Sequence, residues 1–432
     1  MSGVFLKPRP FEKAAGTFLL LPLLPQPRPM KPLPVEVWAQ IFAFSLAAKE
    51  NDHNDGYPLK SLDFLIICKS FHDIVLPLIY ETARISNMSS LEKFFNRLYA
   101  ADQKWDGLRR IPYSTPGRWV QNIDLSDIAF ESQPQAIHFD TILTKLFPLT
   151  PFLMSLSINP SLILSRRALV SLASREGSVY LRSLSGISYF TPFSPVPDED
   201  PFVQLLRNCP NLEELYIVGQ GLDPLELEFN LSALDFPSMK AFHPLRLPKL
   251  RFLSMLSMHS SPLMLALLHS PLPGLRKLTL TPYHDFPYPV SLASEFISTH
   301  GTMLSSLLLF TPKSWPTRLH PSSEDLLIQA PNLRHLSLEN PLPDLQLHGK
   351  HPLSILSIPR PKPEFWRTLE RLLPLLPNLV AVRARDVRWL RKGISSHAQT
   401  AGVQGEMCEW KKRLERRGIR MLDSDWNDRV RD

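Results

Sequence analysis

Three short stretches of the sequence carry residue types that could take part in catalysis. The run DED at residues 198–200 places carboxylates side by side, as general acid–base chemistry could use them. The run GQGL at residues 219–222 has the glycines of a loop that could approach a phosphate. The cysteines Cys68, Cys209 and Cys408 could act as nucleophiles or metal ligands if their surroundings activated them. The neighbouring residues decide whether any of this chemistry is available.

The surroundings of these stretches favour simpler interpretations. DED closes a proline-rich segment, PFSPVPDEDP at residues 192–201, so a solvated acidic loop is favoured over a working carboxylate pair. GQGL follows a strand-like segment and is interpreted as a turn. The three cysteines are far apart and form no C-x-x-C pair, which fits a reducing compartment and argues against disulfides or a zinc site. None lies in a motif that lowers a thiol pKa, so a thioester-forming ligase is not supported.

The rest of the sequence lacks the motifs of common enzyme classes. No G-x-x-x-x-G-K-[ST], G-x-G-x-x-G, H-E-x-x-H or G-x-S-x-G occurs. The 13 histidines are scattered without metal-ligand spacing, and His72 and His138 are expected on helix surfaces. We therefore predict no catalytic residue, no cofactor and no metal site, so that the protein is not an enzyme. An enzyme with an unrecognised site on its repeat face is the alternative.

The positive charge of the chain is concentrated in one segment. Between Arg383 and Arg420, 11 Lys and Arg residues face 4 Asp and Glu residues, a net charge of +7 that equals the charge of the whole chain. A nucleic-acid-binding protein is expected to carry a basic stripe on its working face. The run WKKRLERRGIR within this segment instead resembles a solvated helix face, so no nucleic acid is expected, and an anionic partner is the alternative.

The N-terminal leader is rich in proline and carries no clear targeting signal. Its apolar run FLLLPLL at residues 18–24 is interrupted by Pro22 and lacks a small-residue cleavage site. We expect residues 1–29 to form a disordered arm. No run of about 18 apolar residues occurs, so no membrane segment is expected. The expected location is cytoplasmic, nuclear or both.

Two apolar segments after the leader predict a small helical module. In PLPVEVWAQIF at residues 32–42, Val37, Trp38, Ile41 and Phe42 share one helical face, and Pro34 suits the first turn. A second segment, LKSLDFLIICKSFHDIVLPLIYETARI at residues 59–85, also has helical spacing, and its Pro77 is expected to break or kink the helix. Such a small unit cannot bury all of its apolar surface, so we expect it to need a partner.

These two segments together resemble an F-box, in the form common in fungal proteins. The match covers residues 33–85, and its strongest part is the run I-C-K-S-F-H-D-I-V-L-P-L-I-Y. The loop at residues 49–58 is longer than in the family. The resemblance implies docking onto the small SKP-type adaptor of cullin–RING ubiquitin ligases. The residues that match the family's adaptor-facing or module-holding positions are Leu33, Pro34, Val37, Ile41, Leu65, Ile66, Cys68 and Phe71. The simplest interpretation of Cys68 is a small buried hydrophobic residue.

The body of the chain repeats one pattern, L-x-x-L-x-L. The copies are WVQNIDL at Trp119, FLMSLSI at Phe152, YLRSLSGI at Tyr180, PNLEELYI at Pro210, PKLRFLSM at Pro248, PGLRKLTL at Pro273, TMLSSLLL at Thr302, PNLRHLSL at Pro331, PLSILSI at Pro352 and PNLVAVRA at Pro377. Their first apolar positions lie 20 to 38 residues apart, and the spacing resembles that of leucine-rich repeat proteins. The resemblance implies a solenoid with one parallel strand per repeat and helices on the outer, convex side.

Each pattern predicts inward-pointing leucines and outward-pointing residues between them. Prolines such as Pro210 stand two residues before the first leucine, where they end the preceding helix. Amphipathic stretches such as DPFVQLLRNC and EDLLIQA are expected to form the convex wall. The outward residues would line a concave face that binds a target protein, and the named candidates are Glu214, Tyr216, Phe252, Ser254, Lys277, Thr279, Ser306, Leu308, His335 and Ser337.

The sequence therefore predicts an α/β protein of five parts. They are a disordered arm at 1–29, an F-box at 30–86, a helical linker at 87–115, a leucine-rich repeat solenoid at 116–390 and a basic C-terminal helix or cap at 391–432. The resemblances imply a substrate-recognition subunit of an SCF-type ubiquitin ligase. Its expected partners are the SKP-type adaptor, the cullin–RING core reached through it, and an unknown target protein. A repeat scaffold without a ligase role is the alternative.

Overall fold

The computed structural model describes most of the chain in ten ranges. They are residues 33–48, 64–104, 116–130, 132–190, 196–221, 242–258, 261–282, 291–312, 320–390 and 402–428. The arm at 1–29 and the loop at 49–58 lie outside these ranges. The chain divides into two compact units, Met1–Leu78 and Ile79–Asp432, which are described separately below as the helical unit and the sheet unit.

Among its described residues, the helical unit contains three helices. Helix α1 spans Val35–Ala48, α2 spans Phe64–Ile67 and α3 spans Lys69–Glu81, the last running on into the sheet unit. Pro34 lies just before α1, and its carbonyl accepts hydrogen bonds from the amides of Val37 at 3.1 Å and Trp38 at 3.2 Å. Pro77 lies inside α3 without ending it, so the helix break that the sequence suggested does not occur.

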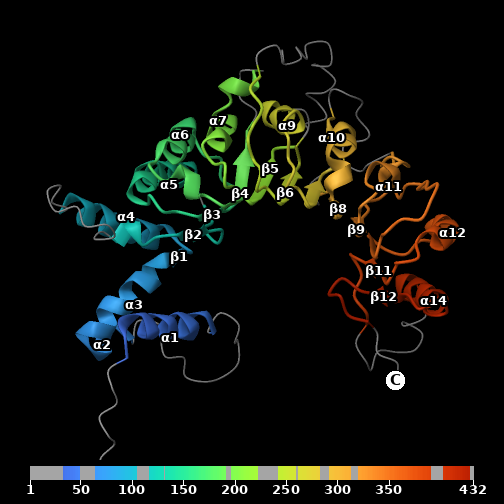
Figure 1. The fold of residues 1–432 in the computed structure, drawn as a ribbon, viewed down its shortest axis with the longest axis horizontal. Helices are drawn as coiled ribbons and strands as arrows, with labels where there is room; N and C mark the ends of the chain where they lie inside the picture. Colours follow the sequence, from blue (N-terminus) through green and yellow to red (C-terminus); the bar gives the residue numbers. More distant parts are fainter. Residues whose placement is uncertain are drawn as a thin grey trace, which may run out of the picture. The chain divides into compact units, whose positions relative to one another are not determined.

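The described residues of the sheet unit form an open parallel sheet of 12 strands whose order in space is their order in the sequence (Figure 1). The strands are β1 (Thr82–Arg84), β2 (Asn122–Leu125), β3 (Ser155–Ile158), β4 (Ser183–Tyr189), β5 (Glu214–Gly219), β6 (Phe252–Leu256), β7 (Lys277–Leu280), β8 (Ser306–Leu309), β9 (His335–Ser337), β10 (Ile355–Ile358), β11 (Ala381–Ala384) and β12 (Arg420–Leu422). Every one of the ten predicted repeat copies contains one of the strands β2 to β11, so the predicted parallel stacking is confirmed.

The apolar positions of the pattern form the core of this unit. In the copy at β5, Leu212, Leu215 and Ile217 are all buried, and the same three positions are buried in every other copy. The parallel register places each such residue beside its equivalent on the next strand, as Leu215 lies beside Leu253 of β6. Because each strand covers only its neighbours, one continuous core runs along the unit from Ile85 to Met421.

Helices lie in most of the described connections between strands, along one side of the sheet (Figure 1), whereas the connection from β9 to β10 contains none. They are α4 (Met88–Gln103), α5 (Gln133–Leu146), α6 (Arg166–Ser174), α7 (Pro201–Arg207), α9 (Pro262–Leu268), α10 (Ala293–His300), α11 (Leu326–Gln329), α12 (Pro363–Leu372) and α14 (Gly402–Glu415). Pro210 lies in the turn between α7 and β5, as the repeat pattern predicts. We call the opposite side, where the outward strand residues lie, the helix-free face.

The sheet extends beyond the predicted solenoid at both ends. Strand β1 precedes residue 116 and pairs with β2, and β12 follows residue 390 and pairs with β11. Neither short strand carries the repeat pattern, which is why the sequence did not reveal them. Helix α4 also belongs to this unit rather than forming a linker on its own, because its Leu91 and Leu98 are buried in the continuous core.

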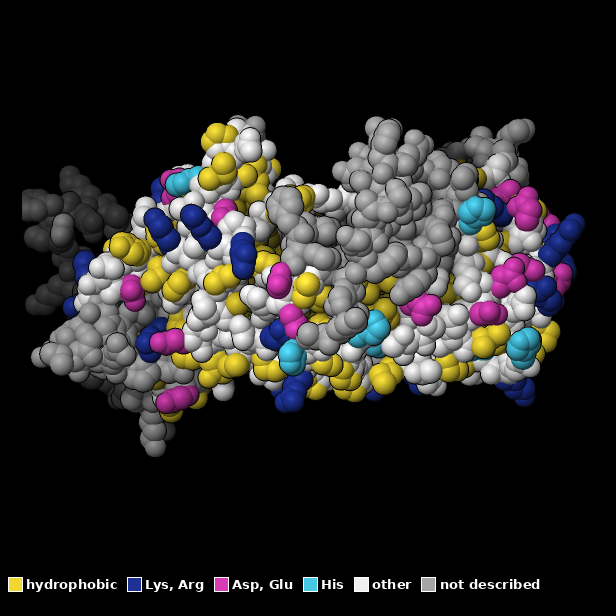
Figure 2. Space-filling view, turned by 90° about the horizontal axis from the view of Figure 1, so that it is seen from above, with side chains coloured by type: hydrophobic (Ala, Val, Ile, Leu, Met, Phe, Trp, Pro, Cys, Tyr) yellow, Lys and Arg dark blue, Asp and Glu magenta, His cyan; other side chains and the backbone are white. Residues whose placement is uncertain are grey.

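The basic C-terminal segment packs more tightly than a solvated helix face would. Trp410 of α14 is buried and meets the ring of Trp366 with centroids 5.0 Å apart. The Lys411 side chain is only 12% exposed and contacts Asp428 at 3.0 Å and Glu415 at 3.6 Å. At this end of the molecule, on the right of Figure 2, positive and negative side chains are interspersed. The solvated interpretation is therefore wrong for Lys411.

A glycine in β4 provides a test of the strand packing. Gly186 has φ of +70°, lies at a register shift between β4 and β5, and a Cβ there would stand 1.9 Å from the Ile158 carbonyl oxygen. We expect Gly186→Ala to destabilise the protein by about 1–3 kcal/mol, measured as a lower urea midpoint. Gly349→Ala is the matched control, since nothing lies within 4 Å of its Cβ position. Equal midpoints for the two variants would contradict this account.

Candidate protein-interaction surfaces

Four aromatic rings hold the helical unit together. Phe42 of α1 is buried and contacts Trp38, Phe64 and Phe71, with ring centroids 5.8, 5.3 and 4.9 Å apart. Trp38 also meets Phe71 of α3 at 4.8 Å. This cluster joins all three helices, and Val75 of α3 is also buried. The sequence placed Trp38 and Phe42 on one helical face but did not identify them as the centre of the module.

Many of the other described apolar residues of the helical unit, above all in α1 and α2, are exposed. Ile66 is 83% exposed and Phe44 is 77% exposed. The full set of exposed large apolar residues among the described positions of this unit is Leu33, Val35, Val37, Ile41, Phe44, Ile66 and Ile67. Exposed apolar residues at this density are typical of a surface that another molecule covers.

The structure separates the eight predicted F-box residues into two groups. Phe71 lies in the aromatic cluster, and both it and Leu65 are half-buried. The other group is exposed and consists of Leu33, Pro34, Val37, Ile41, Ile66 and Cys68. Cys68 is not the small buried residue suggested by its type, because it lies between α2 and α3 and its Sγ accepts a hydrogen bond from the Phe71 amide at 3.4 Å.

The predicted target-binding residues do lie together on the helix-free face. The parallel register places Glu214, Phe252, Lys277, Ser306 and His335 beside one another on strands β5 to β9. A second row on the same face lies two residues further along each strand. It consists of Tyr216, Ser254, Thr279, Leu308 and Ser337. The repeat pattern thus located these side chains correctly, although it does not show what they bind.

Part of this face is hollowed into a groove of about 470 Å³ across β4 to β7. Its aromatic side chains are Tyr216, which is half-buried, and Phe252, which is 43% exposed. Burial raises the pKa of the Tyr216 hydroxyl, so this group stays protonated at neutral pH. Ser254 Oγ also lies in the groove and makes no hydrogen bond to any described residue. The groove therefore offers an aromatic surface bordered by the charges of Glu214 and Lys277.

A C-terminal segment covers another part of the same face. Trp426 lies against the His335 ring of β9, with centroids 6.0 Å apart, and under the guanidinium of Arg383 of β11 at 4.2 Å. The Asp423 carboxylate shapes this turn by accepting hydrogen bonds from the amides of Asp425 and Asn427, both at 2.9 Å. The sequence interpretation missed this contact, because WND at residues 426–428 has no repeat pattern. The open part of the face is consequently nearer to β4–β8.

His335 is held neutral by its surroundings. Burial, then the positive charges of Arg383 and Lys277, lower its pKa to about 4. Its Nε2 atom lies 2.9 Å from the Ser357 Oγ atom. The charges of Arg383 and Lys277 thus add to the effect of burial on this imidazole.

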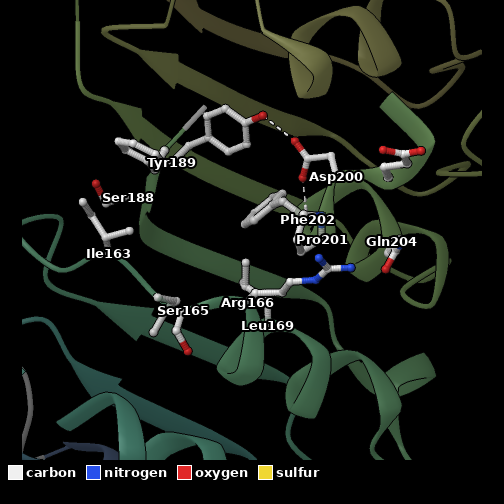
Figure 3. A pocket seen from close by; sticks show the side chains of 13 residues that line it. Ile163, Ser165, Arg166, Leu169, Ser188, Tyr189, Asp200, Pro201, Phe202 and Gln204 are labelled. Carbon is white, nitrogen blue, oxygen red and sulfur yellow. Dashed lines mark hydrogen bonds between the residues drawn. The ribbon is translucent and has the colours of Figure 1, made fainter. Parts of the chain in front are cut away.

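A second hollow, of about 560 Å³, lies beside the start of α7 (Figure 3). The Asp200 carboxylate on its wall accepts hydrogen bonds from the Tyr189 hydroxyl and from the amides of Phe202 at 2.6 Å and Val203 at 3.3 Å. Burial raises the pKa of both Asp200 and Tyr189, so the tyrosine donates and does not ionise at neutral pH. These bonds make Asp200 a helix cap rather than a free base.

Asp198 and Asp200 are therefore not the solvated loop residues that the sequence suggested, whereas Glu199 is exposed. Asp200 is only 1% exposed. Asp198 pairs with Arg207 and with His243, whose Nδ1 atom is 3.1 Å from the carboxylate, and these contacts lower its pKa against the opposing effect of burial. By contrast, the predicted helix-surface positions of His72 and His138 are confirmed.

Two other searches concern the described residues alone. Within these ranges, no three His, Cys, Asp or Glu side chains lie close enough to hold a metal ion together. Among the helices of the described ranges, none has both the length and the apolar character needed to cross a membrane.

Comparison with known proteins gives no assignment. No family model matches the chain, and no curated protein matches it.

The unusual environment of His335 generates a pH prediction. Because its pKa of about 4 lies below the ordinary 6.5, the unfolded chain binds this proton more readily between these two pH values. Stability should therefore fall as the pH is lowered from 6.5 to 4. We expect His335→Gln to lose less stability over this window than the parent chain, measured by urea unfolding at several pH values.

The lowered pKa values of His300 and His351 act in the same direction in both proteins and cancel in this comparison. An imidazole of His335 that titrates near 6.5 by NMR would contradict the prediction.

Proposed function

We propose that this protein is the substrate-recognition adaptor of an SCF-type ubiquitin ligase. In this proposal the helical unit is an F-box that binds the SKP-type adaptor, and the sheet unit is a leucine-rich repeat solenoid that binds the target. The protein performs no chemistry of its own. It raises the concentration of the target near the ligase core, which is where ubiquitin transfer takes place.

The observation that carries the proposal is the exposed apolar surface of the helical unit. Six of the eight residues that match the F-box pattern are exposed, although four of them, Leu33, Val37, Ile41 and Ile66, are large and apolar. Phe44 and Ile67 add to this surface. Leaving such side chains in water forgoes about 1.5–3 kcal/mol for each one that a partner would bury. A partner with a matching apolar surface would recover this energy.

The sheet unit supports the second half of the proposal. Parallel strands in sequence order, with buried apolar residues at the repeat positions of β2 to β11, match the architecture expected of a leucine-rich repeat array. The helix-free face offers a groove that contains Tyr216 and Phe252, and exposed aromatic residues are frequent where proteins bind one another. The two units thus carry two different kinds of surface, as an adaptor between two partners requires.

The helical unit can be tested with a purified SKP-type adaptor. Ile66→Glu places a charge on the most exposed apolar residue, so it should leave folding intact and weaken adaptor binding at least about tenfold in a pull-down or by calorimetry. Leu33→Ala combined with Pro34→Ala should also weaken it. Val170→Glu, at a 45% exposed residue of α6 in the sheet unit, is the control and should bind as the parent chain does.

The outcome also separates the proposal from its alternative. A chain that ignores the adaptor but retains a target protein would be a repeat scaffold without a ligase role. Unchanged adaptor binding by both the Ile66 and the Leu33–Pro34 variants would remove the F-box assignment of these residues.

A further inference from the structure

The N-terminal ends of strands β6, β7 and β9 carry exposed cations beside the groove. Arg251 and Arg276 directly precede the first residues of β6 and β7, Arg334 directly precedes β9, and Lys277 is the first residue of β7 and also lines the groove. All four side chains are exposed. Successive backbone hydrogen bonds join these rungs, since the Arg251 carbonyl accepts from the amides of Arg276 and Lys277, both at 2.9 Å. We call these four residues the basic edge.

The basic edge makes no ion pair within the part of the chain that the structure describes, although Glu213 precedes β5 at the same end of the strands as Arg251. None of its four side chains forms an ion pair with a described residue, whereas Arg371 and Arg413 on the helix side do so with nearby carboxylates. Along the two rows of the helix-free face from β6 to β11, the described residues include Lys277 and Arg383 but no carboxylate.

The dimensions suit a short extended peptide. Neighbouring strands are about 4.8 Å apart, so the edge from β6 to β9 covers about 14 Å. An extended chain advances about 3.3 Å per residue, so about five residues would span it. An apolar side chain of the same peptide could occupy the groove beside Tyr216 and Phe252.

We propose that the basic edge and the adjoining groove bind an acidic segment of a protein partner. Carboxylate side chains would lie against Arg251, Arg276, Lys277 and Arg334, and one apolar side chain would enter the groove. This inference rests on the proposed function, because it names the chemical class of the target that the helix-free face would recruit.

A nucleic acid fits the same region less well. Glu214 lines the groove in the same row as Phe252 and Lys277, where it would repel a phosphate backbone. The cations lie along one edge only, whereas single-stranded nucleic acid is usually held in a groove that is positive along its length. A peptide can place an uncharged residue next to Glu214 and its acidic residues further along.

The test uses the full chain and three fluorescently labelled peptides of about nine residues, long enough to span the basic edge. All three carry the same apolar residues, and their other positions are all Glu, all Lys or all Ser. Anisotropy should show binding of the Glu peptide alone, weakening at least about tenfold between about 50 and about 300 mM salt. The double variant Arg276→Glu, Lys277→Glu should also weaken it at least about tenfold.

Controls make the result specific. Arg97→Glu changes an exposed arginine of α4 that lies away from the groove, and it should change binding less than about twofold. Equal binding of the three peptides, no binding of any, or tighter binding of an oligothymidylate than of the Glu peptide would each overturn the inference.

The adaptor assay on the same preparation keeps the two proposals apart. Loss of the acidic-segment inference with intact adaptor binding would leave the proposed F-box function standing. Conversely, Ile66→Glu should leave binding of the Glu peptide unchanged.

Discussion

Burial of apolar side chains between adjacent strands is the interaction on which the rest of the sheet unit depends. Each repeat contributes three such residues, as Leu212, Leu215 and Ile217 do at β5. Their burial stabilises by about 5–9 kcal/mol in total, whereas ordering the 20 or more residues of one repeat costs more than that in conformational entropy. A single repeat therefore cannot fold alone. Stability comes from stacking, which also forces the strands into sequence order and parallel register.

The alternation that buries the side chains on one side of each strand leaves those on the other side outside the core. Residues such as Glu214, Phe252 and Lys277 can differ from strand to strand without disturbing the core, because the register alone aligns them. Chemical variety on this face is therefore compatible with a uniform interior. The helical unit differs, because a small cluster of four rings forms its centre and apolar residues such as Ile66 remain in contact with water.

The repeat pattern predicted ten strands, their order and the side chains on the helix-free face, since each rests on local alternation and spacing. It missed β1 and β12, whose three-residue strands are defined by pairing rather than by composition. The proline-rich segment and the residue type also gave wrong predictions for the burial of Asp200 and Cys68. The burial of Asp200 depends on Tyr189 and on the start of α7, and the exposure of Cys68 depends on a gap between two helices. No local pattern encodes such contacts. The stacking of Trp426 on Arg383 is long-range in the same sense.

The late position of β12 in the chain has a consequence for synthesis. Strand β12 pairs with β11, and Asp428 in turn forms a bridge with Leu422 on its outer side. The ribosome delivers these residues only after the eleven preceding strands have emerged. Until then, the amides and carbonyls of β11 form an open edge that can pair with a foreign strand. Nascent chains stalled before residue 420 should thus be more prone to co-aggregate than chains that have been released.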